Sequence, residues 1–379
     1  MKIKIAEIVT KLELGGAQKN VLTIIRGLPK DKYDFFLITS RGFLADEVLA
    51  IPGIKVFFIN NLKRQISPLN DIITSFLLWR ILRKYRIDIV HTHSSKAGIL
   101  GRFAARLAGV KTIFHTIHGW SFHDYQNIVI KKAYVMLERI AAHFTTNLIA
   151  VSNYDIEKGL RNKIGTRSQY RLIRYGIDIS KYQNPDIERG REDLLLNIRK
   201  ESPVIGMVAC FKPQKAHANF LKIARMVLRE IPEVHFVFVG DGVLRKDVQT
   251  MASSFDKKEN FHFLGWRQDI ERIYHSIDIL ALSSLWEGLP LVFIEAGASG
   301  KPVVATAICA NHEVIHNGIN GFLVKPDDIN DFSGRLIFLL KNKTLASQMG
   351  SRAKEFLLSD FKEEAMLSKF DNLYFSLKA

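Results

Sequence analysis

Short apolar runs alternate with longer amphipathic runs along the whole chain. In the first half, the runs "KIKIAEIV", "DFFLIT", "KVFFI", "DIVHTHS", "KTIFHTIH" and "NLIAVS" are typical of buried parallel strands. Between them, runs such as "GAQKNVLTIIRGL" and "NDIITSFLLWRILRKYR" have the spacing of amphipathic helices. This alternation predicts a parallel sheet that is covered by helices on both faces.

The same alternation starts again in the second half, with "PVIGMVACF", "HFVFVGDG", "FHFLG", "DILALSS", "KPVVAT" and "GFLV". Two successive patterns predict two doubly wound α/β domains, over residues 1–185 and 203–360. A polar stretch of mixed charge between them lacks any strand pattern, and it predicts a linker over about 186–202. The end of the chain, about 361–379, predicts a final helix with the option of crossing back to the first domain. Because ligands of such sheets bind beyond the carboxyl ends of the strands, we expect a site in the cleft between the domains.

Composition limits the compartment. The chain of 379 residues has only two cysteines, Cys210 and Cys309, which suits a reducing compartment and argues against a disulfide framework. The first apolar run is too short for a signal peptide, and none approaches the roughly 20 residues of a membrane span. We therefore expect a soluble, cytoplasmic protein.

Positive charge is concentrated in the first half of the chain. The net charge is +16; residues 1–180 contain 28 Lys+Arg and 13 Asp+Glu, whereas residues 181–379 contain 26 and 25. Such an excess favours an anionic partner, and nucleic acid and anionic lipid are both candidates.

The run over 62–86 mixes cations, Lys63, Arg64, Arg83 and Lys84 among them, with large apolar residues. It is consistent with a basic amphipathic element on a membrane surface, and equally with a helix that packs on the sheet and solvates its charges.

The stretch "SLWEGLPLVFIEAGASGKPVVAT" begins at Ser284 and places two acids, Glu287 and Glu295, around an apolar run. One interpretation is a capping box, with Ser284 as the N-cap and Glu287 reaching back to it. A helix that begins there would, however, carry Pro290 past its first turn, where proline removes a hydrogen bond. Pro290 fits better at the first helical position.

A helix that begins at the proline leaves Glu287 and Gly288 in the preceding loop. The free N–H groups of Leu291 and Val292 then form a phosphate site at the positive end of the helix. Flanking carboxylates would repel a phosphate but would accept hydrogen bonds from hydroxyl groups on either side of it. This layout suits a nucleotide sugar, which places a diphosphate between a ribose and a hexose.

These residues resemble the E-x7-E signature of glycosyltransferase family 4, whose members are retaining enzymes with the two-domain GT-B fold. The resemblance covers nearly the whole chain and includes "GGAQ", "HTHSSKAGILGRFAARLAGVKTIFHTIHG", "LIAVS", "RYGID", "PQK" and "VGDG". It implies that Glu287 meets the transferred sugar and that Glu295 holds the donor ribose. It also implies that Gly16, in a glycine turn before a helix, lies beside the donor phosphates.

The segment "ACFKPQKAH" follows a predicted strand and supplies a candidate phosphate ligand in Lys215, which is otherwise an exposed turn lysine. The family pattern has an arginine where Cys210 stands and a glycine where Ala216 stands. If the strand persists, Lys212 projects to the same side as Cys210 and supplies the missing charge.

Five of the twelve histidines, His91, His93, His115, His118 and His123, lie within a short span. His91 and His93 share a strand face as in H-x-H metal sites, but no cysteine or carboxylate-rich partner follows at ligand spacing. We therefore expect no metal, and a buried structural role for His115. The resemblance places His118 against the transferred sugar or its phosphate.

Together these observations predict a metal-independent glycosyltransferase that needs no cofactor and uses a nucleotide-sugar donor, expected to be a UDP-sugar. The expected acceptor is a glycan or lipid-linked molecule, bound by the basic N-terminal domain on the inner face of a membrane. Two alternatives stay open at this point: a nucleotide-sugar epimerase of the same fold, and a basic nucleic-acid-binding protein, for which no recognition motif is present.

Overall fold

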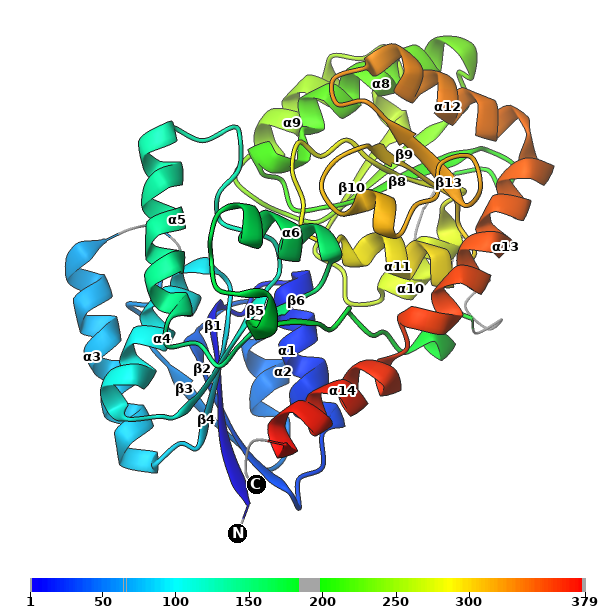
Figure 1. Cartoon of the computed structure of the whole chain (residues 1–379). Coiled ribbons are helices and arrows are strands. Elements are labelled where there is room, and N and C mark those ends of the chain that lie inside the picture. The colour runs from blue at the N-terminus through cyan, green and yellow to red at the C-terminus, as the bar shows by residue number, and fades with distance from the viewer. Residues whose placement is uncertain (1, 64, 66, 184–197, 377–379) are drawn as a thin grey trace. The chain divides into compact units, whose positions relative to one another are not determined.

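The computed structural model describes residues 2–63, 65, 67–183 and 198–376, which form two compact units (Figure 1). Unit 1 comprises residues 1–176 and 363–379, and unit 2 comprises residues 177–362. The chain changes unit at Ile177, earlier than the predicted boundary at 185. Ile177 forms a parallel bridge with Lys362, and its N–H donates to the carbonyl of Phe361 at 2.9 Å, so it belongs to unit 2. Most of the predicted linker, residues 186–197, lies outside the described residues.

Unit 1 is built on a parallel sheet of seven strands in the order β3-β2-β1-β4-β5-β6-β7. The strands are β1 (Ile3–Lys11), β2 (Tyr33–Ser40), β3 (Ile54–Phe58), β4 (Ile89–His93), β5 (Thr112–Ile117), β6 (Asn147–Ala150) and β7 (Tyr170–Leu172). Each run predicted as a strand contains one, whereas β7 was missed because three residues are too few to show a pattern.

Helices cover both faces of this sheet: α1 (Gly16–Gly27), α2 (Ala45–Leu49), α3 (Pro68–Tyr85), α4 (Ser95–Ala108), α5 (Ile128–Ala142), α6 (Asn153–Arg161) and α14 (Glu363–Phe375). Side chains of α1, α2 and α14 form one core with Ile5 and Val9 of β1. Side chains of α3 and α4 form a second core with Ala6 and Ile8, which alternate with the first pair along the strand. The C-terminal helix therefore belongs to unit 1 and helps to bury β1 and β4.

Unit 2 has a parallel sheet of six strands in the order β10-β9-β8-β11-β12-β13. The strands are β8 (Val204–Val208), β9 (His235–Val239), β10 (Phe261–Gly265), β11 (Ile279–Leu282), β12 (Val303–Thr306) and β13 (Gly321–Val324). The helices are α8 (His217–Glu230), α9 (Arg245–Ser253), α10 (Ile270–Ser276), α11 (Leu291–Ala298), α12 (Ile329–Lys341) and α13 (Lys343–Asp360). The six predicted strands of this half are all present.

The strand orders confirm two doubly wound, Rossmann-like sheets and mark where ligands bind. The order reverses between β1 and β4 in unit 1, and between β8 and β11 in unit 2. In open α/β sheets, the loops after two such strands diverge, and ligands generally bind at their carboxyl ends. Of the candidate residues, Gly16 follows β1, Lys212 and Lys215 follow β8, and Glu287 follows β11, whereas His118 follows β5. Among the described residues, no helix combines the length and the hydropathy needed to cross a membrane.

Candidate active site

In unit 2, the loops after β8 and β11 bring Lys215 and Glu287 into direct contact. The ammonium group of Lys215 forms an ion pair with Oε1 of Glu287, and the two side chains are 13% and 7% exposed. Gln214 donates from Nε2 to Oε2 of Glu287 at 3.2 Å and to the carbonyl of Trp286 at 2.8 Å. Both carboxylate oxygens of Glu287 are therefore held by the loop after β8, which also carries Lys215, the predicted phosphate ligand.

Backbone contacts hold these two loops together. The N–H of Leu285 donates to the carbonyl of Gln214 at 2.8 Å, and the hydroxyl of Ser283 donates to the carbonyls of Lys215 and Ala216 at 3.2 and 3.3 Å. Ala216 has a φ of 49°, in the left-handed region, where the family pattern has glycine. The positive φ gives the family's preference for glycine a physical reason, and this chain accepts the strain of alanine there.

Helix α11 begins at Leu291, directly after Pro290, so it begins within one residue of the predicted start. The capping box of Ser284 and Glu287 is not formed, because both residues lie in the loop before the helix. The free N–H groups at the start of α11 include those of Leu291 and Val292, which are partly exposed. Gly288 lies in the same loop between Glu287 and the helix, as predicted.

Glu295 lies on α11 and is only 2% exposed. Its Oε2 accepts a hydrogen bond from the hydroxyl of Tyr274 at 2.9 Å, and its Oε1 accepts one from Tyr182 at 3.2 Å. Burial, together with the negative charge of Glu295, raises the pKa of both tyrosines, so both hydroxyls stay protonated and donate. The predicted ribose ligand is thus a carboxylate whose orientation two tyrosines fix.

The structure contradicts the reasoning that placed Lys212 beside Cys210. Strand β8 ends at Val208, and the N–H of Lys212 donates to the carbonyl of Cys210 at 2.8 Å. This short turn interrupts the alternation of an extended strand, so alternation cannot place the two side chains on one side. Lys212 nevertheless lies in the same loop as Lys215, three residues earlier.

In unit 1, Gly16 begins α1 after the extended residue Gly15, so the predicted glycine turn does lead into a helix. His118 follows β5, which β4 separates from β1 in the sheet. It is partly exposed, beside a small pocket that Ser94, Gly119 and Ser121 also line. The hydroxyl of Ser121 in this pocket has no hydrogen-bond partner among the described residues. His118 therefore borders a polar opening at the carboxyl end of the sheet.

Both ring nitrogens of His118 have protein partners. Its Nε2 lies 2.9 Å from Nδ1 of His93, and its Nδ1 lies 2.7 Å from the hydroxyl of Tyr175. His115, by contrast, is 3% exposed and its Nδ1 lies 2.9 Å from the hydroxyl of Thr92, as expected of a buried structural histidine.

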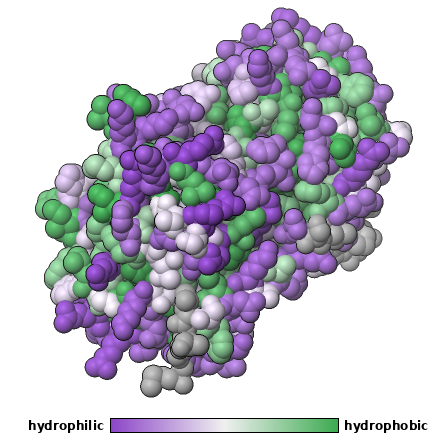
Figure 2. Space-filling view, viewed as in Figure 1, coloured by the Kyte–Doolittle hydropathy of each residue, from purple (hydrophilic) through white to green (hydrophobic). Residues whose placement is uncertain are grey.

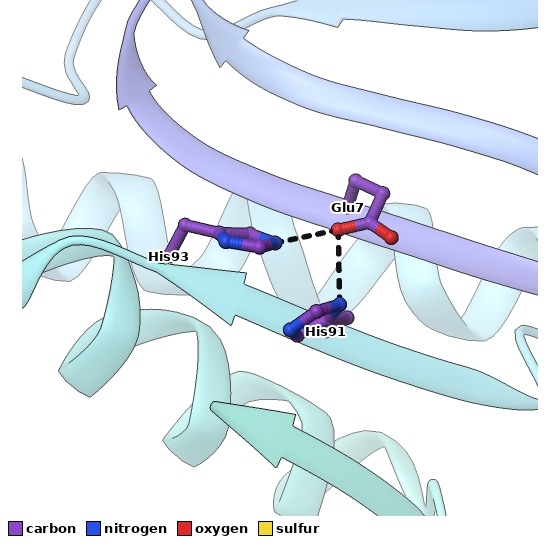
Figure 3. Close-up of side chains that lie close together, drawn as sticks. All are labelled: Glu7, His91 and His93. Carbon is purple, nitrogen blue, oxygen red and sulfur yellow. Dashed lines mark hydrogen bonds and ion pairs between the residues drawn. The ribbon is translucent and has the colours of Figure 1, made fainter. Parts of the chain in front are cut away.

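Sequence reasoning missed Glu7, a fully buried carboxylate on β1. Its Oε2 lies 2.7 Å from Nε2 of His93 and 3.3 Å from Nδ1 of His91 (Figure 3). The hydroxyl of Tyr374 donates to its Oε1 at 3.0 Å. A signal was present: Glu7 interrupts the apolar run "KIKIAEIV", as Glu295 interrupts a later one. Its partners lie more than 80 positions away, so no local spacing could identify them.

Glu7, His91 and His93 also form the group among the described residues that could hold a metal ion, with ligand atoms within 4.8 Å of one another. No cysteine or carboxylate-rich partner follows the two histidines in the sequence, and Glu7 instead reaches them from a strand 86 positions before His93. The same atoms, however, hydrogen-bond to each other, and His91 also bonds Tyr374 at 2.6 Å and Thr116 at 2.7 Å. These hydrogen bonds engage the same nitrogen and oxygen atoms that would bind a metal ion. They therefore explain, without a metal, why three polar side chains are fully buried together.

The residues predicted to touch a membrane lie on and before α3. Lys63, Arg83 and Lys84 are exposed, and Arg64 lies outside the described residues. Helix α3 packs Thr74, Leu78 and Leu82 inward, so the packing interpretation holds for that face. Its N-terminal half exposes large apolar residues instead: Leu69, Ile72, Ile73 and Phe76, at 72%, 68%, 38% and 55%.

A second apolar surface was not predicted. Helix α5 buries Val135, Glu138, Ala141 and Ala142, and its opposite face carries Val129, Ala133, Met136 and Ile140. Their spacings of four, three and four residues place them in one line along the helix. Val129, Met136 and Ile140 are 70%, 57% and 43% exposed, and Figure 2 shows apolar patches over both α3 and α5.

Comparisons with known proteins agree with this architecture. The families described as "Glycosyltransferase Family 4" and "Glycosyl transferases group 1" match residues 14–181 and 191–356. The UDP-Gal:alpha-D-GlcNAc-diphosphoundecaprenol alpha-1,3-galactosyltransferase of Escherichia coli is 34% identical over 99% of this chain and 97% of its own. The N,N'-diacetylbacillosaminyl-diphospho-undecaprenol alpha-1,3-N-acetylgalactosaminyltransferase of Campylobacter jejuni is 25% identical over 93% and 94%.

Two solved structures share the fold. HepE of Anabaena, in complex with UDP-glucose, superposes with a TM-score of 0.84 at 21% identity and covers 99% of this chain and 100% of its own. Sucrose-phosphate synthase of Thermosynechococcus elongatus gives 0.85 at 20% identity over 100% and 99%. These likenesses identify the fold as GT-B.

Proposed function

Because this chain belongs to glycosyltransferase family 4, we propose that it transfers a hexose from a UDP-sugar to a lipid-linked acceptor, with retention of anomeric configuration. The observation that carries the proposal is the 34% identity, over nearly the full length of both chains, with an enzyme named for a UDP-Gal donor and a diphosphoundecaprenol-linked acceptor. The Campylobacter relative is also named for a diphospho-undecaprenol-linked molecule. Such acceptors suit the synthesis of a cell-surface polysaccharide or glycolipid.

Unit 2 is proposed to bind the donor. Lys215, Lys212 and the free amides of Leu291 and Val292 offer positive charge and N–H donors to a diphosphate. The carboxylate of Glu287, held by Lys215 and Gln214, is proposed to accept hydrogen bonds from hydroxyls of the transferred sugar. Charge that develops on the leaving diphosphate in the transition state is then met by groups that are already oriented.

Glu295 is proposed to hold the ribose. Tyr182 and Tyr274 each donate to one oxygen of this carboxylate and keep its plane fixed. An ionised carboxylate only accepts hydrogen bonds, so it suits the hydroxyl groups of a ribose, which can donate to it.

We propose that transfer needs no metal ion. The chain has no D-x-D acid pair near a strand end, and the lysines and helix amides of unit 2 supply the charge that an ion would provide. Excess EDTA should therefore leave activity unchanged. Activity that EDTA abolishes and Mg²⁺ or Mn²⁺ restores would contradict this, and measured initial rates distinguish the two results.

The experiment that tests the function combines binding and turnover. UDP and a panel of UDP-sugars should raise the melting temperature, because a ligand of the native state stabilises it by mass action. The stabilising UDP-sugar is then incubated with and without a polyprenyl-diphosphate-linked sugar, and products are identified by mass spectrometry. A lipid product longer by one hexose supports transfer.

The same experiment separates the alternatives. A new UDP-sugar that forms without any acceptor would identify an epimerase, which the named relatives do not favour. Stabilisation by random DNA but by no UDP compound would instead identify a nucleic-acid-binding protein. Either result would overturn the proposal.

A further inference from the structure

A continuous chain of hydrogen bonds runs through unit 1 and includes His118. Tyr374 on α14 donates to Oε1 of Glu7 at 3.0 Å, and Oε2 of Glu7 lies 2.7 Å from Nε2 of His93. Nδ1 of His93 lies 2.9 Å from Nε2 of His118, and Nδ1 of His118 lies 2.7 Å from the hydroxyl of Tyr175. Glu7 and His93 come from adjacent strands, β1 and β4, and are fully buried (Figure 3).

The charge of Glu7 determines where the protons of this chain lie. Burial by itself would raise the pKa of Glu7, but the charge and hydrogen bonds of His91 and His93 outweigh it and lower the pKa to about 2. Glu7 is therefore a carboxylate that can only accept. Because its Oε2 faces Nε2 of His93, that nitrogen must carry a proton.

The position of the proton on His93 determines which nitrogen of His118 carries a proton. Burial lowers the pKa of His93 to about 4, so its ring is neutral at neutral pH and only one of its nitrogens carries a proton. With the proton on Nε2, Nδ1 of His93 must accept, and the proton of that bond belongs to Nε2 of His118. Burial also lowers the pKa of His118, so its Nδ1 accepts from the hydroxyl of Tyr175.

We propose that Glu7 is a positioning residue for sugar transfer: through His93 it fixes His118 in the Nε2–H tautomer and holds the plane of its ring at the pocket. This inference rests on the proposed role of His118 next to the transferred sugar. The ring of His118 is then held in one orientation beside that pocket, with its two nitrogens bonded to His93 and Tyr175, instead of exchanging between two tautomers.

Packing gives no reason for an acid at this position. Ile5 and Val9, which share the face of Glu7 along β1, are apolar and fully buried in the core of α1 and α14. A buried carboxylate seldom stabilises a fold more than a well-packed apolar residue of similar size. Contacts with His93, His91 and Tyr374 offset the cost of burying the carboxylate of Glu7. Its effect on His93 and His118 gives a functional reason for an acid at this position.

The tautomers can be measured without any activity assay. In protein with ¹⁵N-labelled histidine, the two ring nitrogens are distinguished by their chemical shifts and long-range proton couplings. His118 is assigned by its absence from the spectrum of His118→Gln. The proposal requires that His93 and His118 both carry their proton on Nε2. A proton on Nδ1 of either ring would overturn it.

Three variants connect the tautomer to the reaction. Glu7→Leu removes the acceptor, so His118 should show mixed tautomers and kcat should fall about 10- to 100-fold, as expected of a misplaced catalytic group. Glu7→Gln keeps an oxygen that can accept from His93, so both properties should return toward the parent values. Val9→Ala is the matched control: it leaves a cavity on the same face of β1 but keeps the acceptor, so His118 should stay in the Nε2–H form.

These outcomes show whether Glu7 fixes the tautomer of His118 or only contributes to the packing of the core. If Glu7→Leu retains the Nε2–H tautomer and loses no more activity than Val9→Ala, the proposal is wrong. A bound metal ion at one equivalent in chelator-treated protein would also overturn it, because a metal would displace the proton from His93. A third outcome is that no sugar transfer is found, while His118 is in the Nε2–H form in the parent and shows mixed tautomers in Glu7→Leu. In that case the proposed function is wrong, but the effect of Glu7 on the protons of His93 and His118 is confirmed.

Discussion

At the scale of single residues, the two acids eight positions apart have different surroundings. Glu287 is held by Lys215 and Gln214 in a loop, whereas Glu295 is held by two tyrosines on a helix. Glu287→Gln should lower kcat strongly and donor affinity modestly, because its contacts to the sugar matter most in the transition state. Glu295→Gln should mainly raise the KM for the donor. Initial rates over a range of donor concentrations separate the two effects.

The control for these two substitutions is Glu233→Gln, at an exposed position of unit 2, which should change neither constant. Equal loss of donor binding in both variants, with kcat unchanged in both, would show that the division of roles between Glu287 and Glu295 is wrong.

The lysines of the loop after β8 lead to a second prediction. Lys215→Ala should weaken binding of UDP more than binding of uridine, because only UDP carries the diphosphate that the ammonium group would meet. Lys212→Ala should do the same if it compensates for Cys210. Isothermal titration with both ligands measures this, and exposed Lys246→Ala on α9 serves as the control. If Lys212→Ala binds UDP as tightly as the parent, compensation is ruled out.

At the scale of elements, α5 carries apolar side chains on the face opposite its buried one. The outward line Val129, Ala133, Met136 and Ile140 has Lys132 and Arg139 beside it, and both cations are exposed. Together with the apolar half of α3, this surface suits an anionic bilayer, where a lipid-linked acceptor would lie. Each cation near such a surface contributes on the order of 1 kcal/mol, and apolar side chains add a contribution that salt does not screen.

This surface predicts two separable effects in liposome sedimentation. Replacing Lys63, Arg64, Arg83 and Lys84 by Ser should remove the preference for anionic lipid, because charge causes it. Replacing Val129, Met136 and Ile140 by Ser should remove the binding that remains at high salt, because burial of apolar surface causes that part.

The matched control replaces Val243, Met251 and Ile319 by Ser. These residues are apolar, 81%, 41% and 52% exposed, and located in unit 2, so binding should stay unchanged. Equal partitioning of the parent to neutral and anionic vesicles, or no partitioning at low salt, would contradict the membrane proposal and favour an acceptor free in solution.

At the scale of the whole molecule, several histidines are buried in a neutral form. Burial lowers the pKa of His93 to about 4, that of His217 to about 3 and that of His262 to about 4. Between the ordinary value near 6.5 and these lowered values, the unfolded chain binds protons that the native protein does not. The free energy of unfolding should therefore fall as pH falls from about 7 to 4, by about 1.4 kcal/mol per pH unit for each such histidine. Urea midpoints at several pH values measure it.

His217 provides a direct test. Its ring is 1% exposed and stacks on Phe211 at 4.3 Å, and neither ring nitrogen has a hydrogen-bond partner among the described residues. His217→Phe should fold and should show a weaker dependence of stability on pH. His143→Gln, at an exposed position on the surface of unit 1, should leave the dependence unchanged. Stability that rises toward pH 5, or a slope that His217→Phe does not alter, would contradict the assignment.

The sequence by itself determined the features that depend on neighbours along the chain. Apolar runs predicted the strands, because a parallel strand that is buried on both faces consists mostly of consecutive apolar residues. Pro290 located the start of α11 to within one residue, because proline cannot lie deeper in a helix. The resemblance carried by "EGLPLVFIEAGASGKPVVAT" indicated the family.

Only the tertiary structure decided which of these residues touch. Parallel strands that are adjacent in a sheet come from distant parts of the chain, and here their pairing places Glu7 beside His93 and Gln214 beside Glu287. Local alternation failed at Lys212 because a turn, not a strand, follows β8. The apolar face of α5 was equally hidden in the sequence, since a helical period shows that a stripe exists but not whether it faces the core or the solvent.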